Sequence, residues 1–275
     1  MQTIGYLGPM GTFSEEAVLK YGSAAQRIAY ASIPQVTDAI ESGEVDEAIV
    51  PIENSLQGAV TDVLDFLIRT KVVRIKNELA IPVNNCLIVT RGSKAGDAVV
   101  IYSHPQPLGQ CRQYLSKNFP MIELVASLST ASAVEDMLSS SRSAAAIAPR
   151  RAGEIYGADI AEDRIQDNPR NFTRFIVLAD DDHKRTGCDK TSIAFWFGSD
   201  KPGILHQAMG TFANRGINLM KIESRPTGES LGSYVFLADV EGHRTDKVII
   251  SALNELRNHT SELRVFGSYP RMEKP

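Results

Sequence analysis

The hydrophobic and polar positions of the chain follow two alternating periods. Short apolar runs such as Ile4–Leu7 and Glu47–Ile52 are typical of buried strands. The stretch Val60–Leu67 instead places apolar side chains three and four residues apart, as one face of a helix does. This alternation of strand and helix continues through residues 1–180 and predicts mostly parallel sheets with helices on both faces.

The same pattern predicts two α/β lobes in this region. The chain leaves the first lobe near Ala80 and returns near Asn171, so lobe 1 takes residues 1–80 and 168–180 and lobe 2 takes residues 81–167. A cleft between two lobes is a usual place for a small ligand. The expected helices are Ser14–Tyr21, Ile33–Ile40, Val60–Leu67, Leu108–Asn118, Ala131–Leu138 and Pro149–Tyr156, and the further strands are Val72–Leu79, Ile81–Thr90, Val99–Ser103, Ile122–Ala126, Ala144–Ala148 and Phe175–Ala179.

Polar, often glycine-bearing turns follow several of these strands. Gly8–Ser14 and Glu53–Ala59 both lie where a strand runs into a helix. In parallel sheets the ligand crevice lies at the carboxyl ends of the strands, and the N-terminus of a following helix offers free N–H groups to an anion. The spacing matches neither a Walker loop nor the GxGxxG fingerprint, and a single such turn is more often an ordinary strand–helix connection.

The pattern changes after a charged stretch without periodicity. We interpret residues 181–189 as a linker and His183 as a solvated side chain. Residues 190–275 then predict a βαββαβ unit, a ferredoxin-like sandwich. Its expected elements are the strands Thr191–Gly198, Ile217–Arg225, Ser233–Val240 and Leu263–Tyr269, a helix starting at Asp200–Gly203 and a helix over Thr245–Arg257.

Composition narrows the class of protein. With 275 residues, 43% hydrophobic and 23% charged, the chain is long enough for two or three globular domains. A net charge of −4 without a basic run argues against a nucleic-acid partner. An anionic substrate therefore needs positive charge supplied locally, by a few Arg or Lys side chains or by helix N-termini.

Cysteine usage indicates a reducing compartment, and the spacing of cysteine and histidine gives no sign of a metal site. The three cysteines are widely spaced and form no CxxC, and the five histidines form no HxxH or HExxH. The start of the chain resembles no signal peptide, and no apolar run approaches the ~20 residues of a membrane span. We expect a cytoplasmic protein that contacts no membrane.

The stretch Asn171–Phe175 carries the densest set of reactive side chains. It follows the turn signal Asn168-Pro169, and an amide, a hydroxyl and a guanidinium lie within four residues of one another. The simpler interpretation is a turn leading into a strand, with Thr173 and Arg174 satisfying backbone groups.

Taken together, the polar turns resemble the prephenate dehydratase family. The matching segments are Gly8-Pro9-x-Gly11-Thr12-Phe13-Ser14, Pro51-Ile52-Glu53-Asn54-Ser55, Ser103-His104-Pro105-Gln106, Ser129-Thr130-Ala131 and Asn171-x-Thr173-Arg174-Phe175. The C-terminal unit resembles an ACT domain at Asp200-Lys201-Pro202-Gly203-x-Leu205 and Glu223-Ser224-Arg225-Pro226. The family often has Ala where this chain has Ile204. No chorismate mutase segment precedes Ile4, so we expect a monofunctional enzyme.

The resemblance implies a fold and a reaction. The fold is a two-lobed, type II periplasmic-binding-protein-like catalytic domain over residues 1–180, followed by the ACT domain. The reaction is the decarboxylating dehydration of prephenate to phenylpyruvate in phenylalanine biosynthesis, without a cofactor. It also implies phenylalanine as feedback inhibitor and a homodimer or homotetramer. An arogenate dehydratase and a non-catalytic sensor of a small anion are the alternatives.

The resemblance also implies roles for individual residues. Thr173 is the expected hydrogen-bond donor to the departing hydroxyl, with His104 as an alternative acid. Arg174 is either a clamp for the pyruvyl carboxylate or the partner in a salt bridge that fixes its own turn, and Glu53 is expected to be paired. The predicted catalytic residues are Thr173, Arg174 and Phe175; the substrate-binding residues are Thr12, Phe13, Ser14, Asn54, Ser55, His104, Gln106, Ser129, Thr130 and Asn171; the phenylalanine-binding residues are Asp200, Pro202, Gly203, Ile204, Leu205, Asn218, Glu223, Ser224, Arg225 and Pro226.

Overall fold

The computed structural model describes residues 2–199, 201–228 and 233–272. The chain divides into two compact units. One comprises Met1–Val63 and Leu79–Phe175, and the other comprises Leu64–Glu78 and Ile176–Pro275.

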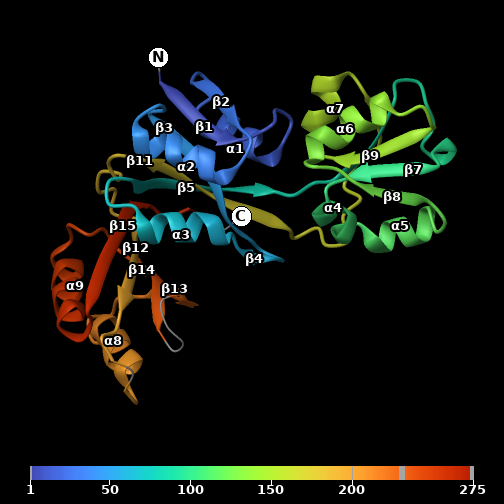
Figure 1. Cartoon of the computed structure of the whole chain (residues 1–275). Coiled ribbons are helices and arrows are strands. Elements are labelled where there is room, and N and C mark those ends of the chain that lie inside the picture. Colours follow the sequence, from blue (N-terminus) through green and yellow to red (C-terminus); the bar gives the residue numbers. More distant parts are fainter. Residues whose placement is uncertain (1, 200, 229–232, 273–275) are drawn as a thin grey trace. The chain divides into compact units, whose positions relative to one another are not determined.

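The first sheet has the strand order β2-β1-β3-β11-β5, and β4 pairs with β3 (Figure 1). Strand β1 is parallel to both of its neighbours, as the βα alternation predicts. The late strand β11 is inserted between β3 and β5, so the chain does return to this sheet. The elements are β1 (Thr3–Leu7), α1 (Phe13–Tyr21), β2 (Gln26–Tyr30), α2 (Ile33–Ser42), β3 (Glu47–Asn54), β4 (Gly58–Ala59), α3 (Thr61–Arg69), β5 (Arg74–Pro82) and β11 (Phe172–Ala179).

The second sheet has the order β10-β6-β9-β7-β8. Figure 1 shows α6 and α7 on one side of it and α4 and α5 on the other. Strand β9 is buried throughout because alternate side chains serve both faces: Ala146 packs toward α6 and α7, and Ile147 packs toward α5. The elements are β6 (Cys86–Val89), β7 (Val100–Ser103), α4 (Pro105–Gln110), α5 (Arg112–Asn118), β8 (Glu123–Ala126), α6 (Thr130–Ser139), β9 (Ala144–Ala148), α7 (Arg150–Tyr156) and β10 (Asp159–Glu162), with a short 3₁₀ turn at Ala95–Asp97.

The third sheet lies in the C-terminal unit and has the order β13-β14-β12-β15, with antiparallel pairing throughout. Helices α8 and α9 contribute Phe212 and Leu256 to a core shared with Phe195 of the sheet. The elements are β12 (Asp189–Trp196), α8 (Ile204–Ala213), β13 (Leu219–Pro226), β14 (Tyr234–Glu241), α9 (Lys247–His259) and β15 (Glu262–Pro270). The predicted α/β class, with a C-terminal ferredoxin-like βαββαβ domain, is confirmed.

Several predicted boundaries were wrong, for identifiable reasons. Strands β2 and β10 were not predicted because both lie at sheet edges and are largely exposed, so they carry little apolar signal. The helix predicted over residues 108–118 is two helices that meet at Cys111, where φ is −110° and ψ is 20°. Strand β5 runs on to Pro82, past the crossover predicted near Ala80.

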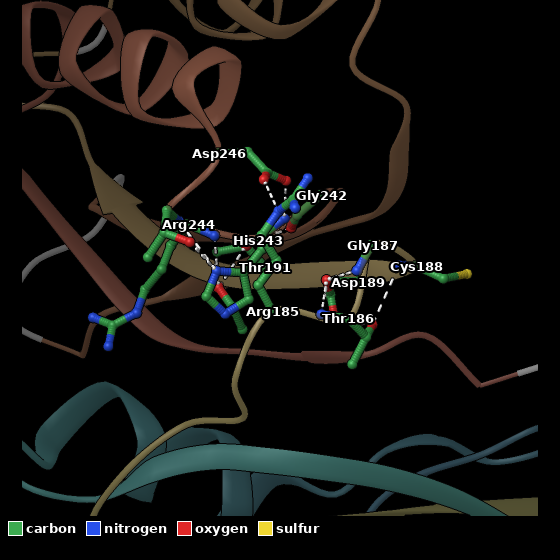
Figure 2. A network of polar contacts seen from close by, with 12 residues as sticks. Arg185, Thr186, Gly187, Cys188, Asp189, Thr191, Gly242, His243, Arg244 and Asp246 are labelled. Carbon is green, nitrogen blue, oxygen red and sulfur yellow. Dashed lines mark hydrogen bonds and ion pairs between the residues drawn. The ribbon is translucent and has the colours of Figure 1, made fainter.

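The segment predicted to be a linker makes several polar contacts within its own unit. Figure 2 shows Arg185 to Asp189 beside Gly242 to Asp246. The carboxylate of Asp189 accepts hydrogen bonds from the backbone N–H groups of Thr186 and Gly187, both at 2.9 Å, and Arg185 pairs with Asp246. The side chain of His183, predicted to be solvated, is half-buried, and its Nδ1 lies 2.6 Å from the carbonyl oxygen of Lys184.

Candidate functional site

The N-terminus of α1 lies at the end of the first polar turn. Thr12 caps the helix by accepting from the N–H of Glu15 at 3.4 Å, while its own hydroxyl donates to Pro9 O at 3.0 Å. Gly11 has a φ of +87°, and a Cβ there would lie 3.0 Å from the Cα of Ala152. Glycine therefore allows this turn to pack against α7. The first N–H groups of a helix lack intrahelical partners, so this end of α1 suits an anion.

Asn54 at the end of β3 connects the two strands of the site. Its Oδ1 accepts from the N–H groups of Leu56 and Gln57 at 3.0 and 3.2 Å, which identifies the other side of the amide as the donor. The Nδ2 group then donates to Thr173 Oγ1 at 3.1 Å and to Asn171 Oδ1 at 2.9 Å. Because Asn54 Nδ2 donates to the Thr173 oxygen, the Thr173 hydroxyl proton remains available to a third group.

His104 occupies the N-cap of α4. Its Nδ1 accepts from the N–H of Gln106 at 3.3 Å, so the neutral ring carries its proton on Nε2. Burial lowers the pKa of His104 below its usual range. Both observations favour the neutral imidazole and weaken the prediction of His104 as the acid.

The N-terminus of α6 completes the wall. The helix was predicted to begin at Ala131, but the side chain of Ser129 accepts from the N–H of Ser132 at 2.9 Å and Thr130 is the first helical residue. The helix thus starts one residue earlier than expected, and Thr130 faces the same space as α1.

These elements surround a cavity of about 240 Å³. The predicted residues Phe13, Ser14, Asn54, His104, Gln106, Thr130, Thr173 and Phe175 border it together with Pro51, Gln57, Gly58, Ala59, Val60, Val83, Pro107 and Gln110. Among the residues that the structure describes, no Asp, Glu, Lys or Arg borders this space. Positive potential there comes from the N-termini of α1 and α6, each followed by at least nine helical residues.

Four predicted site residues support this wall without bordering it. Thr12 and Ser129 cap helices, and Ser55 Oγ accepts from the N–H of Phe172 at 3.0 Å. Asn171 is 1% exposed, and its Oδ1 accepts the hydrogen bond from Asn54 Nδ2. In the structure, the contacts of these four residues hold the lining of the cavity in place.

Arg174 also lies away from the cavity. Alternate side chains of a strand point to opposite faces, and its neighbours Thr173 and Phe175 both border the cavity. Its Nη1 lies 3.4 Å from Glu53 Oε2, so the salt-bridge alternative describes the contact that is present, and Glu53 is paired as expected.

The residues missed by the sequence analysis include the β4 hairpin, Val83 and Gln110. The hairpin carried no strand signal because it is two residues long. Gln110 lies in the first turn of what was predicted to be one continuous helix over residues 108–118, where nothing distinguishes it from a surface glutamine.

The C-terminal unit has its own cavity of about 500 Å³ beside the start of α8. The predicted residues Pro202, Gly203, Ile204 and Leu205 border it, as do the aromatic side chains of Phe197, Tyr234 and Phe236. Asp200 lies outside the described residues. The remaining predicted residues do not border this cavity; Glu223 pairs with Lys221 at 3.4 Å, and Arg225 pairs with Asp65 at 3.0 Å.

Within the described part of the chain, no group of three or more His, Cys, Asp or Glu side chains is arranged to hold a metal ion. None of the helices in the same ranges combines the length and apolar character that a bilayer crossing needs. The three cysteines are free thiols, and Cys86 and Cys111 are buried.

The structure comprises an α/β domain, whose cavity has the size of a small molecule, followed by a ferredoxin-like module. The family model described as prephenate dehydratase matches residues 4–183, and that of the ACT domain matches residues 191–258. The bifunctional chorismate mutase/prephenate dehydratase of Aquifex aeolicus is 40% identical over 269 residues, which cover 98% of this chain and 73% of that protein. The chain therefore belongs to the prephenate dehydratase family and carries an ACT domain.

Solved structures agree. The prephenate dehydratase of Arthrobacter aurescens in complex with L-Phe superposes with a TM-score of 0.89 at 35% identity, covering 98% of this chain and 90% of that one. A protein described as GqqA, a novel type of quorum quenching acylase, superposes with a TM-score of 0.88 at 27% identity, covering 98% of both chains. The predictions of family, enzyme class and ACT domain are confirmed.

Proposed function

We propose that the cavity of the first unit dehydrates and decarboxylates prephenate, with Thr173 as the donor to the departing hydroxyl. The observation that carries this proposal is the hydrogen bond from Asn54 Nδ2 to Thr173 Oγ1, which directs the threonine proton away from Asn54. A donor aimed at an oxygen that gains charge in the transition state accelerates its departure.

Two bonds of prephenate break in the reaction. The bond between the ring and its carboxylate breaks, and its electron pair enters the ring as carbon dioxide leaves. The carbon–oxygen bond on the other side of the ring breaks, and its electron pair stays on the oxygen. The leaving hydroxide takes a proton and departs as water. Thr173 is the proposed donor in this step, and solvent returns the proton to its hydroxyl.

The ring carboxylate loses its charge as it leaves, so a strong ion pair with it would stabilise the ground state and slow the reaction. A cavity bordered by neutral side chains and by the N-termini of α1 and α6 agrees with this requirement. We therefore assign Arg174 a positioning role: its contact with Glu53 links β11 to β3, the strands that carry Thr173 and Asn54.

The test is phenylpyruvate formation from prephenate and, separately, phenylalanine formation from arogenate, in the wild type, Thr173→Ala and Thr173→Ser. We expect prephenate turnover to fall about 100- to 1000-fold in Thr173→Ala and to be largely retained in Thr173→Ser, because serine keeps the hydroxyl. Turnover of arogenate alone would mean that arogenate is the substrate in place of prephenate, and it would leave the proposed mechanism unchanged. Turnover of neither by folded wild type would favour the sensor.

The similarity to a quorum quenching acylase does not change this proposal. Acyl transfer by a hydroxyl uses a base that contacts the nucleophile. In the described chain, the hydroxyl of Thr173 accepts from Asn54, and the Nδ1 of His104 accepts from a backbone N–H. These contacts fit hydrogen-bond donation better than nucleophilic attack.

For the C-terminal unit we propose an L-phenylalanine site in the cavity beside α8. The structurally similar Arthrobacter protein was solved with L-Phe, and in this chain Phe197, Tyr234 and Phe236 supply an aromatic lining. Lys201 and the N-terminus of α8 at Gly203 suit the carboxylate of the ligand. Calorimetry with L-phenylalanine tests this, and absence of binding at millimolar ligand would contradict it.

We further propose that ACT domains pair, so that the protein is a homodimer or homotetramer in the cytoplasm. Light scattering measures the assembly directly. A monomer both with and without phenylalanine would overturn this part. The cytoplasmic location remains a prediction from the cysteine usage.

A further inference from the structure

A second cavity of about 330 Å³ adjoins the first. Gln57, Gln106 and Gln110 border both spaces, so these three side chains form a shared wall. The remaining residues around the second cavity are Leu56, Pro105, Gly109, Gln166, Asp167, Asn168 and Asn171. The lining is rich in amides.

The amide of Asn171 has a defined orientation. Asn54 Nδ2 is a donor, because Asn54 Oδ1 accepts two backbone N–H groups. The atom of Asn171 that faces it at 2.9 Å is therefore the acceptor Oδ1, which Ser55 Oγ also approaches at 3.3 Å. The Nδ2 group lies on the other side of the amide, is buried, and has no hydrogen-bond partner within the described part of the chain.

Gln110, which borders the same cavity, also has an amide donor without a partner. Its Oε1 accepts from Asn85 Nδ2 at 3.3 Å, and its Nε2 is buried without a hydrogen-bond partner among the described residues. Buried amide donors in native proteins are almost always satisfied, and one that is not calls for an explanation. Two unsatisfied donors beside one cavity point to a ligand that brings acceptor oxygens.

Asp167 is the acidic side chain on this wall, and its carboxylate is already engaged. It accepts from the N–H groups of Gln113 and Tyr114 at the start of α5, at 3.0 to 3.2 Å. The donors, rather than this acid, are the groups left for an occupant.

We propose that the second cavity holds the pyruvyl arm of the substrate, with Gln110 Nε2 and Asn171 Nδ2 donating to its keto and carboxylate oxygens. This inference rests on the proposed function, in which the ring lies against Thr173 in the first cavity. In this arrangement Gln110 and Asn171 bind the pyruvyl arm, whose carboxylate Arg174 was predicted to clamp. Both donors are covered by neighbouring side chains, so the arm reaches them by displacing a lining side chain such as exposed Gln57.

The arrangement also sets a preference between substrates. A keto oxygen accepts from an amide N–H, whereas the ammonium group of an amino acid does not. A site built to donate therefore selects prephenate over arogenate.

The experiment compares two ligands that differ at the keto group, phenylpyruvate and 3-phenylpropionate, as inhibitors of prephenate turnover and by calorimetry. We expect the wild type to bind phenylpyruvate about tenfold more tightly or better, because donors that lose their acceptor are left unpaired. Gln110→Met should lose about tenfold for phenylpyruvate and change within about twofold for 3-phenylpropionate.

Asn171→Asp is the second variant, because it keeps the acceptor for Asn54 and removes the donor. Gln113→Met, an exposed glutamine one turn further on, is the matched control and should change neither affinity. Asn171→Asp should weaken the binding of both ligands, because it removes a donor to the carboxylate that they share. Equal affinities of the wild type for the two ligands, or equal losses for both in Gln110→Met, would overturn the inference. Prephenate turnover by the wild type tests the proposed function separately, so the two can fail independently.

Discussion

The amide of Asn54 donates to the hydroxyl oxygen of Thr173 at 3.1 Å, across two strands that are 119 residues apart in the sequence. A hydroxyl that accepts one hydrogen bond becomes a better donor of its own proton, because hydrogen bonds in a chain polarise one another. Asn54 is 5% exposed, so this contact lies in a region where electrostatic effects are strong. The Thr173 hydroxyl is therefore a stronger hydrogen-bond donor, as the proposed function requires.

This contact predicts the effect of Asn54→Asp. The new carboxylate keeps an acceptor for the N–H groups of Leu56 and Gln57, but it replaces the donor with a second acceptor, toward which the Thr173 proton turns. We expect kcat for prephenate to fall between about tenfold and 1000-fold. The melting temperature should fall as well, because a buried carboxylate then faces Asn171 Oδ1. Steady-state kinetics and a thermal melt measure the two quantities.

The matched control is Asn118→Asp, an exposed amide on α5 whose Nδ2 donates to Tyr114 O. It makes the same chemical change away from the cavity and should leave kcat unchanged. An equal loss of kcat in both variants would show that added negative charge, rather than the contact to Thr173, causes the effect.

The contact between Arg174 and Glu53 predicts coupled mutations. If Arg174 acts by linking β11 to β3, Arg174→Met and Glu53→Gln disturb the same contact, and the double variant is hardly worse than either single one. We expect a coupling free energy of about 0.5 to 3 kcal/mol in a double-mutant cycle on kcat/KM. Additive losses, with Arg174→Met raising KM alone, would instead support a substrate clamp.

Glu16 predicts a dependence of stability on pH. Burial raises its pKa to about 7; Arg151 opposes this shift, while Glu15 and Glu154 add to it. The folded state then holds a proton that the unfolded state releases at a lower pH, so stability falls as pH rises from about 4.3 to about 7.

Glu16→Gln removes this dependence. We expect the variant to be more stable than the wild type by about 1 to 3 kcal/mol at pH 8, with the difference vanishing near pH 4. Urea unfolding at both pH values measures it, and Glu41→Gln on the exposed face of α2 serves as the control. A difference that does not depend on pH would contradict the assignment.

His104 predicts a smaller catalytic effect than Thr173. Because burial lowers its pKa, the ring is neutral at pH 7 and carries no proton suited to early transfer. Asparagine can replace its N-cap contact with Gln106, so His104→Asn should lose less activity than Thr173→Ala.

The lowered pKa of His104 also determines the direction in which stability changes with pH. The unfolded state takes up a proton on His104 more readily than the folded state, so this group's contribution is full above about pH 6.5 and is lost as pH falls through the folded pKa. The pH dependence of the melting temperature should therefore flatten below pH 6.5 in His104→Asn. A loss of activity in His104→Asn as large as that of Thr173→Ala would restore histidine as the acid.

Lys190 predicts a large structural effect within the C-terminal unit. Its Nζ lies 2.6 Å from Glu78 and 3.4 Å from Asp239, and all three side chains are at least nine-tenths buried. Removing one partner of a buried ionic group costs about 3 to 5 kcal/mol because the remaining charges lose their compensation.

Lys190→Met should lower the melting temperature by several degrees, and adding Glu78→Gln should recover part of the loss. Lys117→Met, at an exposed position of α5, is the control. A shift no larger than that of the control would mean that the buried cluster contributes little.

Local patterns were sufficient to predict most elements. The buried strands β1, β3 and β9 have apolar runs, and α3 and α9 have an apolar face at helical spacing, so burial and secondary structure leave a direct record in the sequence. The edge strands β2 and β10 are exposed and leave no such record.

The sequence by itself determined the family, the class of fold and the short motifs around the site, because turn chemistry, capping and periodicity are local properties. Only the tertiary structure decided which groups each motif residue contacts. Strand alternation turns Arg174 toward Glu53 and away from the cavity that Thr173 borders, and Asn171 holds Asn54 from behind. Gln110 is an ordinary glutamine in the sequence, and its role as a donor follows from Asn85 and from a cavity built by residues far apart in the chain. Such contacts depend on how distant segments pack, which no local pattern records.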